Sequence, residues 1–64
     1  MQTPTDVMQG LKSVRLGNDL GIKEIAAKMG RDISTVKRIF RGENVSERSI
    51  EAARRVISSH SAPN

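Results

Sequence analysis

The sequence contains no cysteine, no tryptophan and no tyrosine, with a single phenylalanine and a single histidine. Without cysteine, disulfides and thiolate metal sites are excluded. The core must be aliphatic, because Phe40 is the only large aromatic residue. His60 stands alone in a polar C-terminal segment and has no partner ligands for a metal nearby in sequence. We therefore expect neither a metal nor a cofactor.

Long apolar runs are also missing, and none approaches the roughly 18 residues of a membrane span. The first residues, MQTPTDV, have neither a basic start nor an apolar run, so we expect no signal peptide, no membrane contact and a cytoplasmic protein. The 64 residues predict one domain spanning residues 1–64, with an ordered core of about residues 4–58. Since there is no phosphate-binding loop and no carboxylate cluster, we do not expect an enzyme.

The net charge of +4 is concentrated in one third of the chain. Residues Ile22–Gly42 carry six basic and two acidic side chains, whereas basic and acidic residues balance on both sides of this segment. An excess confined in this way is typical of a surface that attracts phosphate. A solvated basic face without any partner has the same composition, so charge alone leaves both interpretations open.

Apolar residues recur at helical spacing, and no segment alternates with period two for long enough to predict a strand. Thr3 is predicted as the N-cap of a first helix with Pro4 at its first position. This helix should end at Gly17-Asn18, which both tolerate the left-handed conformation. Leu20 should be buried in the link that follows.

Three further helices are predicted. Two of them, Ile22–Met29 and Ile33–Phe40, should be stopped by Gly30 and Gly42, and Ser46 should cap a fourth. The sequence thus predicts an all-α fold, a compact bundle of four or five short helices. Its inward-facing residues are predicted to be Val7, Met8, Leu11, Val14, Ile25, Ala26, Met29, Val36, Ile39, Phe40, Ile50, Ala53, Val56 and Ile57.

The segment IKEIAAKMGRDISTVKRIF has the spacing of a helix-turn-helix. Two helices that cross steeply need a small residue where their backbones approach, and Ala26 fits this position. Gly30 follows four residues later and allows a sharp left-handed turn. Val36 and Ile39 come six and nine residues after Gly30 and would lock the second helix against the first.

The stretch LKSVRLGNDLGIKEIAAKMGRDISTVKRIFRGEN resembles the phage lambda repressor and Cro superfamily. The later half, through VSERSIEAARRVI, is also similar to the headpiece of the lac repressor family. The resemblance implies a small prokaryotic or phage transcription regulator that binds double-stranded DNA and is nucleoid-associated. Because such regulators usually read paired half-sites, a homodimer on DNA is expected.

The resemblance also assigns roles to residues. The helix Ile33–Phe40 would lie in the major groove, where Arg38 can bond to guanine through two hydrogen bonds and Ile33 can contact a thymine methyl. Lys23 would meet phosphate together with the free amides of its helix. The residues matching base-contacting positions are Ile33, Ser34 and Arg38; those expected at phosphates are Lys23, Thr35, Lys37, Arg41 and Asn44, with Arg31 and Asp32 as further candidates.

Several residues depart from the family pattern and keep alternatives open. Arg31 replaces an apolar residue after the turn glycine, so Ile33 can rotate inward and become core instead of a base contact. Leu16 and Ile22 are apolar where relatives tend to be polar. They motivate a second function, in which the module binds another protein as an antitoxin-like or anti-activator-like partner. A control protein for excision or transfer of a mobile element is a further variant.

Overall fold

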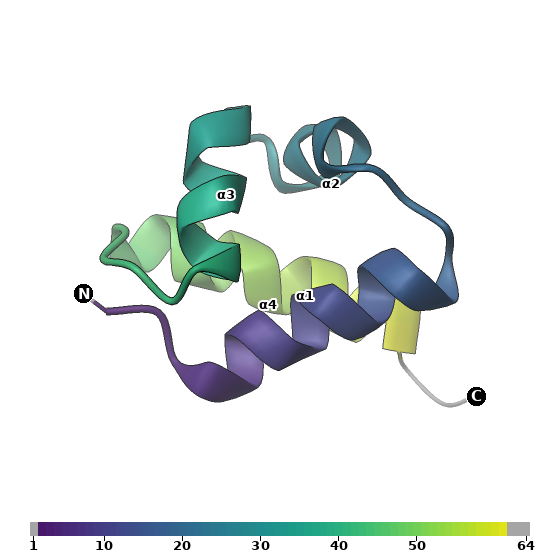
Figure 1. Ribbon diagram of the computed structural model, residues 1–64, viewed down its shortest axis with the longest axis horizontal. Helices are drawn as coiled ribbons and strands as arrows, with labels where there is room; N and C mark the ends of the chain where they lie inside the picture. Colours follow the sequence, from purple (N-terminus) through teal and green to yellow (C-terminus); the bar gives the residue numbers. More distant parts are fainter. Residues whose placement is uncertain (1, 62–64) are drawn as a thin grey trace.

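The computed structural model describes residues 2–61, which form four helices and their links (Figure 1). An all-α bundle was predicted and is confirmed, with four helices and not five. Over the described residues the only strand-like feature is an isolated antiparallel bridge between Gln2 and Asn44. The helices are α1 (Thr5–Gly17), α2 (Ile22–Met29), α3 (Ile33–Phe40) and α4 (Glu47–Ser61).

The two long helices and the two short helices form two pairs. α1 packs along α4, and α2 packs against α3 (Figure 1). The short pair lies across the long pair, with α2 against α4 and α3 against α1. In the view of Figure 1, α2 is seen nearly end-on whereas α3 runs from the top of the picture downward, so the two short helices cross steeply. The N-terminal residues lie beside the link between α3 and α4.

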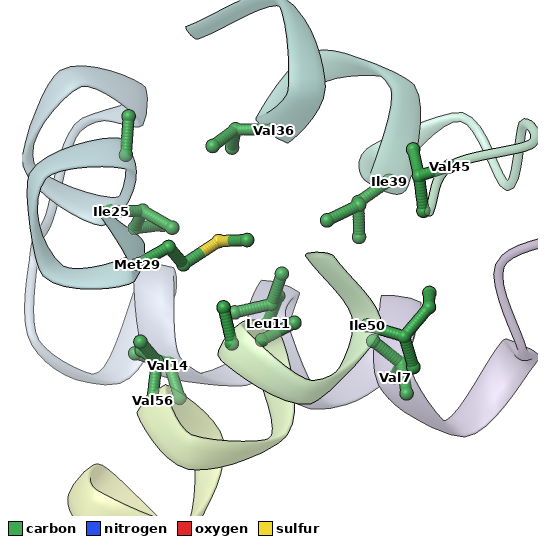
Figure 2. Close-up of a cluster of buried hydrophobic side chains, with 13 residues drawn as sticks. Val7, Leu11, Val14, Ile25, Met29, Val36, Ile39, Val45, Ile50 and Val56 are labelled. Carbon is green, nitrogen blue, oxygen red and sulfur yellow. The ribbon is translucent and has the colours of Figure 1, made fainter. Parts of the chain in front are cut away.

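A single aliphatic core joins all four helices. Figure 2 shows Leu11 of α1, Ile25 of α2, Ile39 of α3 and Val56 of α4 around one centre. Leu20, Ile33, Phe40 and Ile57 are half-buried and pack against it. Most of the predicted core is confirmed, and Val45 and Ala52 are buried without having been predicted. The buried apolar residues are Val7, Leu11, Val14, Ile25, Ala26, Met29, Val36, Ile39, Val45, Ile50, Ala52, Ala53 and Val56.

The start of α1 differs from the prediction. Pro4 occupies the N-cap position, and its carbonyl accepts hydrogen bonds from the N–H groups of Val7 and Met8, both at 3.1 Å. The Thr3 hydroxyl donates instead to the carbonyl oxygen of Glu43 at 2.7 Å, and the Thr3 N–H donates to the same oxygen at 3.2 Å. The prediction of Thr3 as N-cap was therefore wrong. The Thr3 hydroxyl is directed at the carbonyl of Glu43 and makes no capping hydrogen bond to α1.

α1 ends at the predicted residues, but the left-handed backbone conformation is adopted by a residue other than the two predicted. Asn18 has φ −115°, and the left-handed conformation belongs to Asp19 at φ 53°. The N–H of Leu20 then donates to the carbonyl of Arg15 at 2.9 Å. This bond across six residues is the mark of a Schellman motif. Aspartate can take this role because it tolerates left-handed backbone better than most residues.

The bounds of α2 and α3 coincide with those predicted. Gly30 after α2 has φ 69°, and the next N–H donates to the carbonyl of Ala26 at 3.0 Å. Gly42 after α3 has φ 75°, and the N–H of Glu43 donates to the carbonyl of Arg38 at 2.9 Å. Both short helices therefore end in the same way, with glycine in a conformation that other L-residues rarely adopt.

Ser46 caps α4 as predicted, and its Oγ accepts a hydrogen bond from the N–H of Ser49 at 3.3 Å. α4 then continues to Ser61, past the predicted end of the ordered core. His60 is half-buried in the last turn of this helix and does not lie in a polar tail. From the sequence, the end of the chain is expected to fray from about Ser59 to Asn64. This expectation is wrong for residues 59–61, which belong to α4, and residues 62–64 lie outside the described residues.

α1 and α4 approach each other closely at Gly10. A Cβ atom at this position would lie 2.7 Å from Cδ1 and 3.1 Å from Cγ1 of Ile57. Glycine inside a helix costs about 1 kcal/mol relative to alanine, so its presence here is explained by the Ile57 side chain that covers it. No role for Gly10 could be predicted, because a close approach between two helices leaves no local pattern in the sequence.

Candidate functional site

The exposed face of α3 carries a stripe of one polar and three basic side chains. Ser34, Lys37, Arg38 and Arg41 are all exposed. Their spacing of three, one and three residues places them on a single helical stripe. The opposite face of α3 bears Val36 and Ile39, whose side chains are completely buried. We call Ser34, Lys37, Arg38 and Arg41 the α3 stripe. Because the core fixes the helix, it also fixes the direction in which the stripe faces.

Asp32 and Thr35 organise the start of α3. The Thr35 hydroxyl donates a hydrogen bond to Oδ1 of Asp32, and the Asp32 carbonyl accepts one from the N–H of Val36 at 3.3 Å. The Thr35 hydroxyl lowers the pKa of Asp32 below its ordinary value, and backbone N–H groups and the charge of Arg38 act in the same direction. Asp32 therefore stays ionised at neutral pH, which favours the positive end of the helix.

This hydrogen bond also limits what Thr35 can do. Phosphate oxygens in a nucleic acid only accept hydrogen bonds, and the single hydroxyl proton of Thr35 is used by Asp32. A contact from Thr35 to phosphate would have to break that bond. Thr35 is also half-buried. Of the predicted phosphate contacts, Thr35 is thus less available than its exposed neighbours Ser34 and Lys37.

Ile33 and Arg31 lie on either side of Asp32 and differ in exposure. Ile33 is half-buried and packs against the core, with the remainder of its side chain accessible. Arg31 is exposed and lines a shallow depression beside α4, together with Arg48 and Arg55. The inward rotation considered for Ile33 is present in part, and Arg31 faces the helix α4 as well as solvent.

The end of α3 is tied to the N-terminal residues. Arg41 forms an ion pair with Glu43 at 3.7 Å between Nη1 and Oε2, with both side chains about half exposed or more. Such exposed pairs contribute little, about 0–1 kcal/mol, so Arg41 can exchange Glu43 for another anion. Asn44 is exposed and bridges to Gln2. Arg38 and Asn44 lie on the same shallow depression, which Gln2, Gly42 and Glu43 complete.

Lys23 stands apart from the α3 stripe, on the first turn of α2. It is exposed, and its neighbour Glu24 accepts a hydrogen bond from the N–H of Gly21 at 3.1 Å. This bond is one half of a capping box, because glycine has no side chain to complete the other half. Glu24 therefore partly occupies the free amides that were expected to help Lys23 to bind phosphate.

A groove of about 470 Å³ runs between α1, the start of α2 and α3. Two residues of the α3 stripe, Lys37 and Arg41, form part of it. Leu16 is 82% exposed and is the one large apolar side chain among the described residues that is exposed. The Cζ atom of Arg15 lies 5.8 Å from the centre of the Phe40 ring. The groove is lined by Lys12, Arg15, Leu16, Ile22, Lys37, Phe40 and Arg41.

Sequence reasoning missed Lys12 and Arg15 as members of the site, because they lie in a segment whose charges balance. Their spacing of three residues, which puts both on one face of a helix, was the available signal. Among the predicted residues, the structure gathers the α3 stripe along α3 and its C-cap. Two members of the stripe, Lys37 and Arg41, line the same groove as Ile22 and Leu16. Lys23 and Arg31 are not part of that groove.

The remaining arginines belong to α4. Arg54 pairs with Asp6 of α1, with Nη1 and Oδ2 3.1 Å apart and both side chains exposed. The sequence suggested that neighbouring glutamates neutralise this helix, whereas the ion pair that forms joins it to α1. Arg48 and Arg55 are exposed. The basic residues of α4 are therefore not members of the α3 stripe, and one of them, Arg54, is paired with α1.

Residues 2–61 contain no group of three histidines, cysteines or carboxylates placed to hold a metal ion. Over the same residues, no helix has the length and apolar character needed to cross a membrane. Comparison of the chain with models of protein families, with curated proteins and with solved structures gave no match. The function is therefore inferred from the site's own residues.

Proposed function

We propose that the protein binds double-stranded DNA in a sequence-specific manner, with α3 as the recognition helix of a helix-turn-helix. The α3 stripe is the observation that carries this proposal. It presents Ser34, Lys37 and Arg38 on one side of an eight-residue helix whose other side is fixed in the core, and Arg41 at the C-cap of that helix adds a third cation. A helix of this width fits the major groove of B-DNA.

The turn before α3 supports the proposal. A helix-turn-helix needs a small residue, a left-handed turn and apolar contacts across the two helices. Ala26, Val36 and Ile39 are buried, and Gly30 is left-handed with φ 69°. All four residues of the α3 stripe are exposed, so α2 does not cover them. These are the requirements that the sequence spacing anticipated.

Each residue of the stripe has a role that follows from its chemistry. The Arg38 guanidinium can donate two hydrogen bonds to O6 and N7 of guanine, and the Ser34 hydroxyl can reach a base or a phosphate. Lys37 and Arg41 provide attraction to phosphate that does not depend on sequence. The accessible part of Ile33 can contact a thymine methyl. Lys23 and Asn44 extend the phosphate contacts on either side.

The biological role we propose is that of a small prokaryotic or phage transcription regulator acting as a homodimer. Paired half-sites lie about 34 Å apart along DNA. The molecule measures 31 × 20 × 17 Å along its principal axes, so two copies fit side by side on successive major grooves. A control protein for excision or transfer of a mobile element would use the same contacts with DNA.

Two triple variants of equal charge test the proposal. One replaces Lys37, Arg38 and Arg41 with alanine; the other replaces Arg48, Arg54 and Arg55, which are exposed on α4. Duplexes are first selected from a randomised pool with the unmodified protein. Fluorescence anisotropy then measures their affinity as a function of salt concentration.

We expect the α3 variant to lose its preference for the selected duplexes, and the slope of log K against log salt to fall by about two, because Lys37 and Arg41 each neutralise a phosphate. The α4 variant should keep both. An equal loss in the two variants would mean that net charge alone attracts DNA, and the basic segment would then be an ordinary solvated face.

A further inference from the structure

The groove between α1, α2 and α3 combines features that the proposed contacts with DNA do not use. We propose that it binds an acidic, amphipathic segment of a partner protein, and that this segment excludes DNA from α3. The lining of the groove has an apolar part, which we call the floor, and a cationic part, which we call the rim. The floor is formed by Leu16, Ile22 and Phe40. The exclusion of DNA rests on the proposed function, whereas the binding of the segment does not.

The apolar floor indicates that the ligand has apolar groups. Leu16 is 82% exposed although it lies beside Ile22 and Phe40, which are half-buried. Exposure of a leucine next to other apolar side chains is unfavourable in water, and covering it would recover the corresponding hydrophobic free energy. The volume of about 470 Å³ lies within the usual range of binding pockets. The sugar-phosphate backbone of DNA has no apolar groups that match this floor.

The rim determines the charge of the ligand. The rim consists of Lys12, Arg15, Lys37 and Arg41, and no acidic side chain of the described residues lines the groove. Arg15 lies over the Phe40 ring at 5.8 Å, in the geometry of a cation–π contact, which holds its guanidinium beside the floor. Carboxylates on the partner would pair with these cations. A second copy of this groove would be repelled, since it carries the same charges.

A helix with leucines on one face and glutamates beside them satisfies both requirements. Its apolar face would cover Leu16 and Ile22, as helices do in hydrophobic grooves. Its carboxylates would meet Lys37 and Arg41, which also belong to the α3 stripe. A bound segment therefore occupies two of the cations that we assign to phosphate. Binding of the segment and binding of DNA should exclude one another.

The probe is a short synthetic helical peptide, labelled with fluorescein, with leucines on one face and glutamates on both flanks of that face. A scrambled peptide of the same composition, whose leucines are spread over all faces, is its control. The protein variants are Leu16→Ser and, as a matched control, Ala27→Ser, which changes an exposed apolar residue of α2 outside the groove. Neither substitution touches the core, so both variants should fold.

We expect saturable binding of the amphipathic peptide, weaker binding of the scrambled peptide, and a loss of about tenfold in Leu16→Ser, which corresponds to removing part of one leucine contact. Ala27→Ser should bind as the unmodified protein does. Peptide-induced NMR shifts should fall on the residues lining the groove. Equal binding of both peptides, equal affinity of Leu16→Ser, or no saturable binding would each overturn the proposal.

Competition is measured separately with labelled duplex DNA. Saturating peptide should displace the duplex, whereas the scrambled peptide should not. A peptide that binds the groove and leaves DNA bound would overturn the exclusion of DNA but keep the groove as a site. If the protein binds no DNA at all, the proposed function fails, while the peptide titration still decides whether the groove binds an acidic segment.

Discussion

The long pair α1–α4 and the short pair α2–α3 differ in helix length, in net charge and in the contacts that join their helices. α1 and α4 have 13 and 15 residues, whereas α2 and α3 have eight each. The short pair and its glycine stops, Ile22–Gly42, hold the entire net positive charge, and the flanking segments are balanced. The long helices are joined by the close contact of Gly10 with Ile57 and by the ion pair of Asp6 with Arg54.

This difference shows how a small domain can free one surface for binding. A helix of eight residues is not stable by itself in water. α2 and α3 therefore depend on apolar contacts with the long pair, through buried residues such as Ile25 and Ile39. The outward faces of the short helices need to contribute little to stability. The α3 stripe can accordingly consist of cations that repel one another.

The largest expected effect comes from breaking the core that both pairs share. Ile39→Ala removes a side chain with no exposed area from the last turn of α3. We expect a loss of about 2–5 kcal/mol in the free energy of unfolding, with all helices melting in one transition. Chemical denaturation followed by circular dichroism measures this loss. Melting of α2 and α3 ahead of α1 and α4 would contradict a shared core.

The next effect concerns the proposed base contact. Arg38→Ala should lower the affinity for a selected duplex by about 1–3 kcal/mol and relax the preference at one base pair. Stability should change little, since Arg38 is exposed. Arg55→Ala on α4 is the control and should leave the base preference intact. Full affinity and full preference in Arg38→Ala would remove Arg38 from the reading surface.

A smaller difference in stability is expected between alanine substitutions at two glycines, Gly30 and Gly17, at the ends of helices. Gly30→Ala should cost about 1–2 kcal/mol, because φ 69° is strained for any residue with a Cβ. Gly17→Ala should be neutral or stabilising, because Gly17 lies within α1 and nothing is within 4 Å of an added Cβ. Thermal melting of both variants checks the contrast. Equal effects would mean that the turn between α2 and α3 adjusts without strain.

The sequence predicted the short pair better than the long pair. Glycine in left-handed backbone stops a helix by local chemistry, so the bounds of α2 and α3 could be predicted from Gly30 and Gly42. The start of α1 could not, because Thr3 bonds to a carbonyl 40 residues away. The tight contact at Gly10 is likewise a property of two helices together.

Only part of the candidate site could be predicted, because local patterns are visible in the sequence and contacts between distant residues are not. The α3 stripe follows from helical spacing along one segment, and its four residues are all exposed. The groove needs Lys12 and Arg15 from α1 beside Lys37 from α3, which only the packing of the helices brings together. Sequence reasoning noticed Leu16 and Ile22 as misplaced apolar residues but could not place them beside Phe40.

The smallest predicted effect is the pH dependence contributed by Asp32. Its pKa is lowered in the folded protein, chiefly by the Thr35 hydroxyl. The folded state thus binds this proton less tightly than the unfolded state. The stability that it contributes is complete above the ordinary aspartate pKa and is lost as the pH falls through the lowered value. Thr35→Val should raise the pKa of Asp32, as measured by NMR titration; an unchanged pKa would contradict the role of the hydroxyl.

The most direct test of the contrast between the two pairs is an NMR titration of the protein with duplex DNA at two salt concentrations. Amide shifts should concentrate between Arg31 and Asn44, around the α3 stripe, and should weaken steeply at the higher salt concentration. The outer face of α4 should stay unperturbed. An unmoved spectrum, or shifts spread equally over α3 and α4, would contradict the account that α3 is the surface that binds DNA.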